Sequence, residues 1–576
     1  MNIAFKRIRH RACAPLFWVV LLVPGQADAA DTLSAAATTN FPSGNGGGAT
    51  LNVRDFGAVP NDGMNDAPGI QAAINQAGAS GAAVYLPAGI YDLNHGLRAK
   101  SNLIMRGAGS ASALRAKGNF EAVVIDQVSH VVLEALTLDG GQTAQSFGAS
   151  LISIINSSRI TVRRTSLLNS RWTGVFVTNS SGVSIVDNQI DRPALHGIEA
   201  NNGVADLVVE RNLITSAGTN AGDITHGKGI AVTCPHGLCR NVGIVGNTVK
   251  NSHQIAIELW AGLGGAGITG GVISGNVIER LNPGGEQFGI SIDSSRHIAV
   301  TGNTIRGTVY ALEAAAARQV AFIDNTVESP VNGILLSAGA SEIVIAHNLI
   351  KAPRAKGIEI YSGAAPDGKI YPAKNLTVIG NEILNPKDRG IFLNTLGANV
   401  DFLVRGNTVT GGERSGLFIH DADGGVVADN YIAGNNRSGN PSQEANYYYN
   451  VTAGRLRKIL RFNNYQSGQT DDDDRGGVMS RTHPAERGRI RLSGEMKLGA
   501  AGNSRWSFGA DAPTRPCVAG SFHSRTGGKI GLPALYVCRK GAWMVKRRMM
   551  PHNRMSAAIW QRAPAVSLPN ARPFQL

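Results

Sequence analysis

Two short patterns of alternating apolar and polar positions recur along most of this chain. The first is apolar-x-x-Asn-x-apolar, often with Gly before the Asn, and its successive copies lie 22 to 35 residues apart. The second is Gly-apolar-x-apolar, which follows most copies of the first by eight or nine residues. The Asn of the first pattern stands at Asn188, Asn212, Asn247, Asn276, Asn303, Asn325, Asn348, Asn381, Asn407, Asn430 and, more loosely, Asn464. The second pattern begins at Gly174, Gly197, Gly229, Gly289, Gly357, Gly390 and Gly416, and at Ala256 as a variant.

Both patterns have the two-residue period of a β-strand, and they are too short and too rich in Gly for helices. Two or three short strands per repeat predict the coils of a parallel β-helix, an all-β solenoid whose stacked coils share one core. A propeller would need four-stranded blades of about 40 residues, and a leucine-rich repeat would need its Leu pattern. We expect the recurring Asn at a turn, in the left-handed conformation, bonded to the Asn above and below it.

Composition agrees with β structure rich in tight turns. The 576 residues include 71 Gly, and 43% of the chain is apolar while only 17% is charged. This balance excludes a disordered chain and a coiled coil.

Two stretches precede the repeats, NVRDFGAVPNDGMNDAPGIQAAI at 52–74 and VYLPAGIY at 84–91. They resemble the opening of the pectate-lyase/rhamnogalacturonase/epimerase-like family of right-handed parallel β-helices, and the resemblance covers about residues 51–465. It implies a secreted enzyme that acts on a polysaccharide, as a lyase, a hydrolase, an epimerase or a tailspike depolymerase. The Asn-Thr-Asp and Gly-His-Gly motifs of polygalacturonase-like hydrolases and the Asp-Pro-His-Asp motif of alginate epimerases are absent from the sequence. Fold alone does not fix the reaction.

The opening stretch also predicts one helix. Asp66 is expected to cap it, Pro68 fits its first turn, and Ile70, Ala73 and Ile74 form its apolar face. Such a helix would close the open end of the solenoid, which we place at residues 51–470.

The first residues favour export. Residues 1–29 contain a basic start from Lys6 to Arg11, a short apolar run and the small-x-small sequence Ala27-Asp28-Ala29, as in a signal peptide. The apolar run is far shorter than the roughly 20 residues that span a bilayer, so we expect no membrane span. Residues 30–50 are expected to be a flexible linker, and the protein to be secreted or periplasmic.

Four cysteines remain after the signal peptide, an even number that predicts two disulfides in an exported chain, Cys234–Cys239 and Cys517–Cys538. The rival interpretation is a metal site at Cys234, His236 and Cys239, although its ligand spacing is poor.

Positive charge is concentrated after the repeats. The whole chain has a net charge of +14, and residues 475–576 alone hold 18 Lys and Arg against three acids. We divide this part into a linker that is first acidic and then basic at 471–515, a small β module at 516–546 and a basic, disordered tail at 547–576. Because no base-stacking aromatics are interleaved with the basic residues, nucleic acid is not an expected partner.

Candidate chemistry lies where the repeats turn side chains outward. In Gly-apolar-x-apolar-x the two x positions face away from the core and stack from coil to coil. The first outward row reads Phe176, Glu199, Ala231, Glu258, Ser291, Leu335, Glu359, Phe392 and Phe418. The second outward row reads Thr178, Asn201, Thr233, Trp260, Asp293, Glu313, Ser337, Tyr361, Asn394 and His420, with Glu313 aligned only tentatively. His and acidic residues are densest between His196 and Asp293.

This segment supplies our candidate site for a polysaccharide. The candidate catalytic residues are Glu199, Glu258, His196, Lys228, His253 and Asp293. The candidate substrate-binding residues are Trp172, Arg171, Asn201, His226, Trp260 and Gln287.

Two reactions fit these residues. A glycosidase needs two carboxylates, and Glu199 and Glu258, two coils apart, would be separated by about 9.6 Å, near the upper end of the inverting range of ~6.5–9.5 Å. Glu258 and Asp293 form a second possible pair. A lyase or uronan C5-epimerase instead needs a base, for which Lys228, His196 or His253 would serve, and a cation such as Arg171 to neutralise the uronate.

A non-catalytic adhesin or glycan-binding β-helix is the alternative outside enzymes. No cofactor is expected, apart from Ca²⁺ at Asp421-Ala422-Asp423 or at the run Asp471–Asp474. The sequence leaves the oligomeric state open.

Overall fold

The computed structural model describes residues 49–141, 149–218, 227–262, 267–280, 287–362, 371, 373–395, 399–420, 422–438, 447–450, 457–462, 464–467, 495–498, 504–509, 522–525, 534–539 and 542–548. The signal peptide predicted at 1–29, the Asp471–Asp474 run, His226, Cys517 and the tail beyond residue 548 lie outside these ranges.

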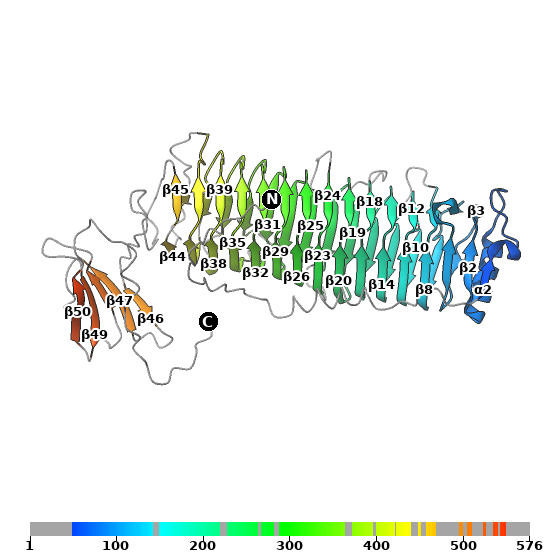
Figure 1. The fold of residues 1–576 in the computed structure, drawn as a ribbon, viewed down its shortest axis with the longest axis horizontal. Coiled ribbons are helices and arrows are strands. Elements are labelled where there is room, and N and C mark those ends of the chain that lie inside the picture. Colours follow the sequence, from blue (N-terminus) through cyan, green and yellow to red (C-terminus); the bar gives the residue numbers. More distant parts are fainter. Residues whose placement is uncertain are drawn as a thin grey trace, which may run out of the picture. The chain divides into compact units, whose positions relative to one another are not determined.

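Three long parallel sheets wind together into a right-handed β-helix, as the repeat pattern predicts (Figure 1). Sheet A has 16 strands: β1 Thr50–Asn52, β2 Ala83–Leu86, β5 Ile104–Gly107, β8 Ser129–Glu134, β11 Ser158–Arg163, β14 Ser181–Val186, β17 Ala205–Glu210, β20 Cys239–Val245, β23 Ile268–Ser274, β26 Arg296–Thr301, β29 Arg318–Ile323, β32 Ser341–Ala346, β35 Lys374–Ile379, β38 Asn399–Arg405, β41 Asp423–Ala428 and β44 Arg457–Phe462. Sheet B has 15 strands: β3 Gly89–Leu93, β6 Ser112–Ala116, β9 Thr137–Asp139, β12 Ser166–Leu168, β15 Gln189–Asp191, β18 Leu213–Thr215, β21 Thr248–Lys250, β24 Val277–Glu279, β27 Thr304–Arg306, β30 Thr326–Glu328, β33 Leu349–Lys351, β36 Glu382–Leu384, β39 Thr408–Thr410, β42 Tyr431–Ala433 and β45 Tyr465–Ser467. Sheet C has 14 strands: β4 Leu97–Arg98, β7 Val123–Asp126, β10 Ile152–Ile155, β13 Val175–Thr178, β16 Ile198–Asn201, β19 Lys228–Thr233, β22 Ile255–Trp260, β25 Phe288–Asp293, β28 Tyr310–Ala315, β31 Asn332–Ser337, β34 Ile358–Tyr361, β37 Ile391–Asn394, β40 Leu417–His420 and β43 Tyr447–Asn450.

Each coil contributes one strand to every sheet, in the order C, A, B along most of the chain. The inward apolar residues form one continuous core; in sheet C, for example, Ile198, Ile230 and Ile257 are fully buried and stack in register. A single repeat could not bury these apolar side chains by itself, so the stacked coils stabilise one another.

The Gly of the second pattern lies where two coils come closest. A Cβ added at Gly197 would lie 2.5 Å from the carbonyl oxygen of Gly229 and 2.6 Å from Ile214 Cγ2. Gly229 is equally confined, with the carbonyl oxygen of Ala256 at 2.5 Å. The pattern therefore records a close approach of backbones at the start of the sheet C strands.

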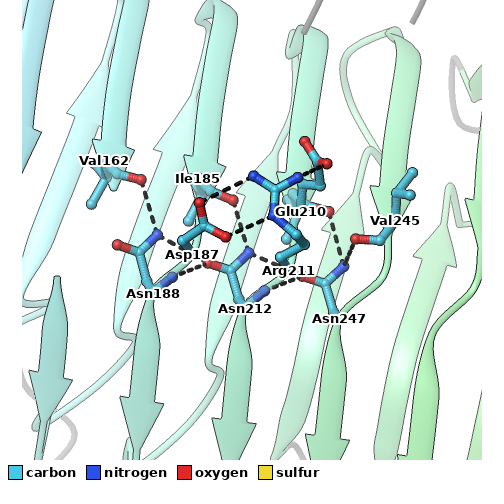
Figure 2. Close-up of polar contacts among 10 residues, drawn as sticks. Val162, Ile185, Asp187, Asn188, Glu210, Arg211, Asn212, Val245 and Asn247 are labelled. Carbon is cyan, nitrogen blue, oxygen red and sulfur yellow. Dashed lines mark hydrogen bonds and ion pairs between the residues drawn. The ribbon is translucent and has the colours of Figure 1, made fainter. Parts of the chain in front are cut away.

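The recurring Asn forms a buried ladder at the turns between sheets A and B (Figure 2). Asn188 Nδ2 donates to Asn212 Oδ1 at 2.9 Å and to the Val162 carbonyl at 2.9 Å, and Asn212 repeats this geometry toward Asn247 and Ile185. The same bonds continue from coil to coil as far as Asn464. The predicted contacts between successive Asn residues are thus confirmed.

The expectation that these Asn residues adopt the left-handed conformation is wrong. From Asn188 to Asn430 the residue just before each Asn of the ladder has the positive φ instead, for example 57° at Asp187 and 64° at Gly246. This explains why Gly so often precedes the Asn: the preceding residue makes the turn, and the Asn supplies the buried hydrogen bonds.

One α-helix stands near the N-terminus. The 3₁₀ turn η1, Val53–Phe56, leads toward α2, Ala67–Ser80, whose Ile70, Ala73 and Ile74 are buried in the common core as predicted. A second 3₁₀ turn, η2, covers Gly109–Ala111. That α2 closes the solenoid remains a prediction.

Asp66 stands at the N-cap position of α2, as predicted, but the expected capping by its side chain is wrong. Asp66 makes no capping bond to the helix; its carboxylate accepts from the backbone N–H groups of Val59, at 2.7 Å, and Asp92, at 2.9 Å. The Ala67 N–H bonds to Asn65 Oδ1 instead. Asp66 thus joins the entry loop to β3.

A separate five-stranded sheet follows the solenoid in sequence. Its strands are β46 Glu495–Leu498, β47 Ser504–Gly509, β48 Phe522–Arg525, β49 Ala534–Arg539 and β50 Ala542–Arg548. β47 and β48 pair in parallel, and the other neighbours pair antiparallel. This part forms a compact unit distinct from the solenoid.

Candidate functional site

The register of sheet C places the candidate carboxylates in one outward row. Glu199 on β16 lies opposite Ala231 on β19, which lies opposite Glu258 on β22. The two acids are therefore two strands apart, about 9.6 Å along the stack. This part of the first row is confirmed.

The tentative place of Glu313 is wrong. Glu313 pairs with Ser291 and so stands in the first row, where Ser291 Oγ donates to Glu313 Oε2 at 2.7 Å. Ala315 takes the place in the second row opposite Asp293. The first row thus carries four glutamates, Glu199, Glu258, Glu313 and Glu359, one at every second coil.

Glu199 is an outward-facing acid in a buried setting. Only 9% of the residue is exposed, and its carboxylate accepts from Asn201 Nδ2 at 3.3 Å and from Thr173 Oγ1 at 3.4 Å. Burial raises the pKa of Glu199 above its usual value, against the lowering effect of these bonds and of Lys228. Thr173 lies in the preceding coil, and neither sequence pattern predicts its contact with Glu199.

His196 lies between Lys228 and Glu199 and contacts both. Its Nδ1 accepts the backbone N–H of Lys228 at 3.2 Å, so the ring proton of the neutral imidazole belongs on Nε2. Nε2 lies 4.0 Å from Glu199 Oε2. His196 is 6% exposed.

Glu258 differs from Glu199 in its partner. The Lys228 ammonium forms an ion pair and hydrogen bond with Glu258 Oε2, and both side chains are nearly buried. An ion pair in a place with little water is strong and favours the charged carboxylate. The two glutamates therefore have the same position in the repeat but different partners: Glu258 pairs with an ammonium, whereas Glu199 accepts from an amide and a hydroxyl.

An exposed aromatic residue lies beside Glu258 in the second row. Trp260, the last residue of β22, is 37% exposed and lies opposite Asp293 of β25. Burial raises the pKa of Asp293, while the Ser294 hydroxyl, which donates to it at 2.6 Å, lowers it. Exposed indole beside polar groups is a surface on which sugar rings commonly stack.

His253 lies in the turn before β22, beside a basic group. Arg280 donates to the carbonyl oxygens of Ser252 and His253, the latter at 2.9 Å. Burial, and to a lesser extent the Arg280 charge, lower the pKa of His253, and burial lowers the pKa of Arg280 to about 10. His253 is therefore neutral over most of the physiological range.

The other candidates occupy the surrounding turns. Arg171 donates to the carbonyl oxygens of Gly140, at 3.1 Å, and Gly141, at 3.4 Å, in the turn before β13. Trp172 adjoins it and is partly buried. Gln287 is 2% exposed, and its backbone carbonyl accepts from the backbone N–H groups of Val309 and Tyr310.

Cys234 and Cys239 form the predicted disulfide, which rules out the alternative metal site at these thiols. Among the residues that the structure describes, no group of three or more His, Cys, Asp or Glu side chains is placed to hold a metal ion. The second predicted disulfide and the Ca²⁺ candidates include residues outside the described ranges. No helix in the described part of the chain is long and apolar enough to cross a membrane.

Comparison with known proteins gives three family matches. Residues 50–264 match rhamnogalacturonase A/epimerase, pectate lyase-like. Residues 261–402 match the right handed beta helix region, and residues 367–452 match periplasmic copper-binding protein (NosD). A search of curated proteins finds no match.

Solved structures share the fold at low identity. The tailspike protein of E. coli bacteriophage HK620 in complex with pentasaccharide is 12% identical, with a TM-score of 0.51, over 72% of this chain and 80% of that one. The Azotobacter vinelandii mannuronan C-5 epimerase AlgE4 A-module is 18% identical, with a TM-score of 0.40, over 71% of this chain and 99% of that one. The catalytic unit of a GH87 alpha-1,3-glucanase from Streptomyces thermodiastaticus is 16% identical, with a TM-score of 0.40, over 74% and 70%.

The three stacked sheets define this chain as a right-handed parallel β-helix protein of the pectin-lyase-like class. The match of residues 50–264 to rhamnogalacturonase A/epimerase, pectate lyase-like, agrees with the resemblance of the opening motif.

Proposed function

We propose that this protein is an exported enzyme that hydrolyses a polysaccharide on the outer face of sheet C. One observation carries the proposal: Glu199 and Glu258 stand in the same row, two coils apart, and have different hydrogen-bond and ion-pair partners. Burial raises the pKa of Glu199, whereas Glu258 is paired with the Lys228 ammonium. Acid and base roles in a carboxylate pair are separated by such differences in environment.

In this reaction Glu199 donates its proton to the glycosidic oxygen as the bond to the anomeric carbon breaks. Glu258 takes a proton from a water molecule, whose oxygen forms the new bond to that carbon. The two-coil separation of about 9.6 Å leaves room for the water and corresponds to inversion at the anomeric carbon. His196 holds its Nε2 toward Glu199, and Lys228 holds Glu258 in place.

The sugar would contact the exposed indole of Trp260 and the amide of Asn201, which both lie in the second row beside the acids. The tailspike with a similar fold was solved with a pentasaccharide, which is in keeping with a glycan ligand here. The disulfide Cys234–Cys239 is compatible with an oxidising compartment, and with residues 1–29 it supports a secreted or periplasmic location.

Elimination is the second candidate, and His253 favours it. Of the three bases considered, Lys228 is engaged with Glu258, and His196 uses Nδ1 to accept a backbone N–H. His253 has a lowered pKa and the Arg280 charge beside it. A neutral imidazole next to a guanidinium could remove the proton alpha to a uronate carboxylate.

The test is incubation of the mature protein with a panel of neutral and acidic polysaccharides. Reducing ends without unsaturated-uronate absorbance indicate hydrolysis, and both signals together indicate elimination. Exchange of the C5 proton with solvent deuterium, without cleavage, indicates an epimerase. Binding without any of these indicates a non-catalytic glycan-binding protein.

Variants then locate the chemistry. Glu199→Gln and Glu258→Gln are each expected to reduce hydrolysis by at least a hundredfold. Glu382→Gln is the matched control, because Glu382 is exposed on β36 of sheet B. Loss on His253→Ala with retained activity in both Glu variants would overturn hydrolysis in favour of elimination.

A further inference from the structure

Sheet C carries the same short motif twice. Ile257-Glu258-Leu259-Trp260 on β22 and Ile358-Glu359-Ile360-Tyr361 on β34 both read Ile-Glu-apolar-aromatic. β25, β28 and β31 separate the two strands, so the motifs lie four steps, or about 19 Å, apart along the same face.

The two copies also share their surroundings. Glu258 pairs with Lys228, and Glu359 pairs with Lys356 at 3.0 Å. The aromatic residue of each copy is exposed, 37% for Trp260 and 41% for Tyr361. Each copy thus joins a Lys–Glu ion pair to an open aromatic surface.

The second copy continues into a group of aromatic and basic side chains on the next two coils. The Phe392 and Phe418 rings lie 5.4 Å apart, and the Arg389 guanidinium stacks 4.3 Å from the Phe418 centroid. Lys356 also lies over Phe392, at 5.3 Å. A guanidinium stacked on a ring keeps its N–H groups in plane for an acceptor.

The number of charged side chains distinguishes this group from the first copy of the motif. Three cations, Lys356, Arg389 and Arg414, surround two carboxylates, Glu359 and Asp388, through ion pairs of 3.0 to 3.8 Å. Three cations thus stand beside two carboxylates in this group, whereas one lysine stands beside one glutamate at Lys228 and Glu258.

We propose that Lys356, Tyr361, Arg389, Phe392, Arg414 and Phe418 form a distal subsite that binds an acidic sugar unit of the same polysaccharide. This inference rests on the proposed function, because it assumes that a sugar chain lies along sheet C. A chain several units long would reach from Trp260 to Tyr361, with its carboxylate facing the basic groups. The distal subsite therefore selects long acidic chains.

The test measures binding of polygalacturonate, alginate and hyaluronate, each beside its carboxyl-reduced form, to the full chain. The wild-type protein is expected to bind at least one acidic polymer more tightly than its reduced form. Arg414→Gln, at a half-exposed position, is expected to weaken that binding about tenfold and to leave the reduced form unaffected. Tyr361→Ala should weaken both. Arg405→Gln is the matched control, since Arg405 is equally exposed on sheet A.

Any one of three results overturns the distal subsite. These are equal affinity for the acidic and reduced polymers, failure of all three acidic polymers to bind, and an equal loss of affinity in the Arg405→Gln variant. These results are separable from the fate of the proposed function. Binding that depends on Arg414 without any cleavage refutes the enzyme and keeps the subsite. Cleavage that is lost in Glu258→Gln but is indifferent to Arg414 and Tyr361 keeps the enzyme and refutes the subsite.

Discussion

Replacing Asn276 tests how much the asparagine ladder stabilises the solenoid. Asn276 is fully buried, and its Nδ2 donates to the Ile244 carbonyl and to Asn303 Oδ1, both at 2.9 Å. Its Oδ1 accepts from the backbone N–H and the side-chain amide of Asn247, at 2.8 and 3.0 Å. Asn276→Ala removes all four bonds and leaves the buried Asn247 N–H without this acceptor.

A net value of about 1 kcal/mol for each hydrogen bond gives a loss of about 4 kcal/mol. That is a large part of the ~5–15 kcal/mol that stabilises a typical domain. Asn276→Asp keeps the volume but turns an oxygen toward two acceptors, so we expect it to be no more stable than Asn276→Ala at neutral pH. The free energy of unfolding in urea, followed by circular dichroism, measures both losses.

Asn94→Ala is the control, because Asn94 is exposed in the turn between β3 and β4. We expect this change to cost less than about 0.5 kcal/mol. A loss below about 1 kcal/mol for Asn276→Ala would refute the reasoning. It would mean that water or a backbone shift replaces the missing amide, and that the ladder only records the geometry of the turns.

Three further predictions follow from the same contacts. Because burial raises the pKa of Glu199 above its ordinary 4.5, its folded-state proton is held more tightly than in the unfolded chain, and the stability that this carboxyl contributes is lost as pH rises through that range. The difference in unfolding free energy between Glu199→Gln and wild type should therefore grow above about pH 4.5, by at most ~1.4 kcal/mol per pH unit, and a difference independent of pH contradicts this. Gly197→Ala should cost about 1–3 kcal/mol in urea unfolding, since its Cβ would meet the Gly229 carbonyl at 2.5 Å, and an unchanged midpoint would show that the coils can separate. Reduction of Cys234–Cys239, which closes a loop five residues apart in sequence, should cost about 2 kcal/mol, seen as a lower Tm with dithiothreitol and absent in the double Ser variant.

The sequence predicts the coils because their signals are constraints on the backbone. Gly197 lies where two coils approach each other closely, and Asn212 lies at a buried turn. The same two requirements recur in other coils, which is why the same residue types recur. The assignment of the left-handed conformation to the Asn failed for a related reason. A buried side chain that bonds to two coils is compatible with several backbone conformations, and only the φ of 50° at Arg211, or of 64° at Gly246, shows which residue turns.

The wrong row predicted for Glu313 shows where the sequence pattern does not determine the register. In the neighbouring coil Gly289 begins the second pattern, but Ala311 occupies the equivalent place on β28 and is fully buried. Without the Gly, nothing in the sequence fixes which residue of this coil is the first to face outward. Register is decided by which side chains fill the core, here Leu312 and Ala314, and a shift of position along the chain moves an acid between rows.

The chemistry of the site depends on contacts between coils, which the sequence pattern does not report. Alternation predicts that Glu199 and Glu258 face outward, but not that both are nearly buried or that only one has a lysine as partner. Lys228 lies 30 residues before Glu258, and stacking converts that separation into direct contact. A solenoid can therefore alter the electrostatics of one acid through a single residue in a neighbouring coil, without changing the strand that holds the acid. The proposed acid and base roles of the two glutamates rest on this difference in partners.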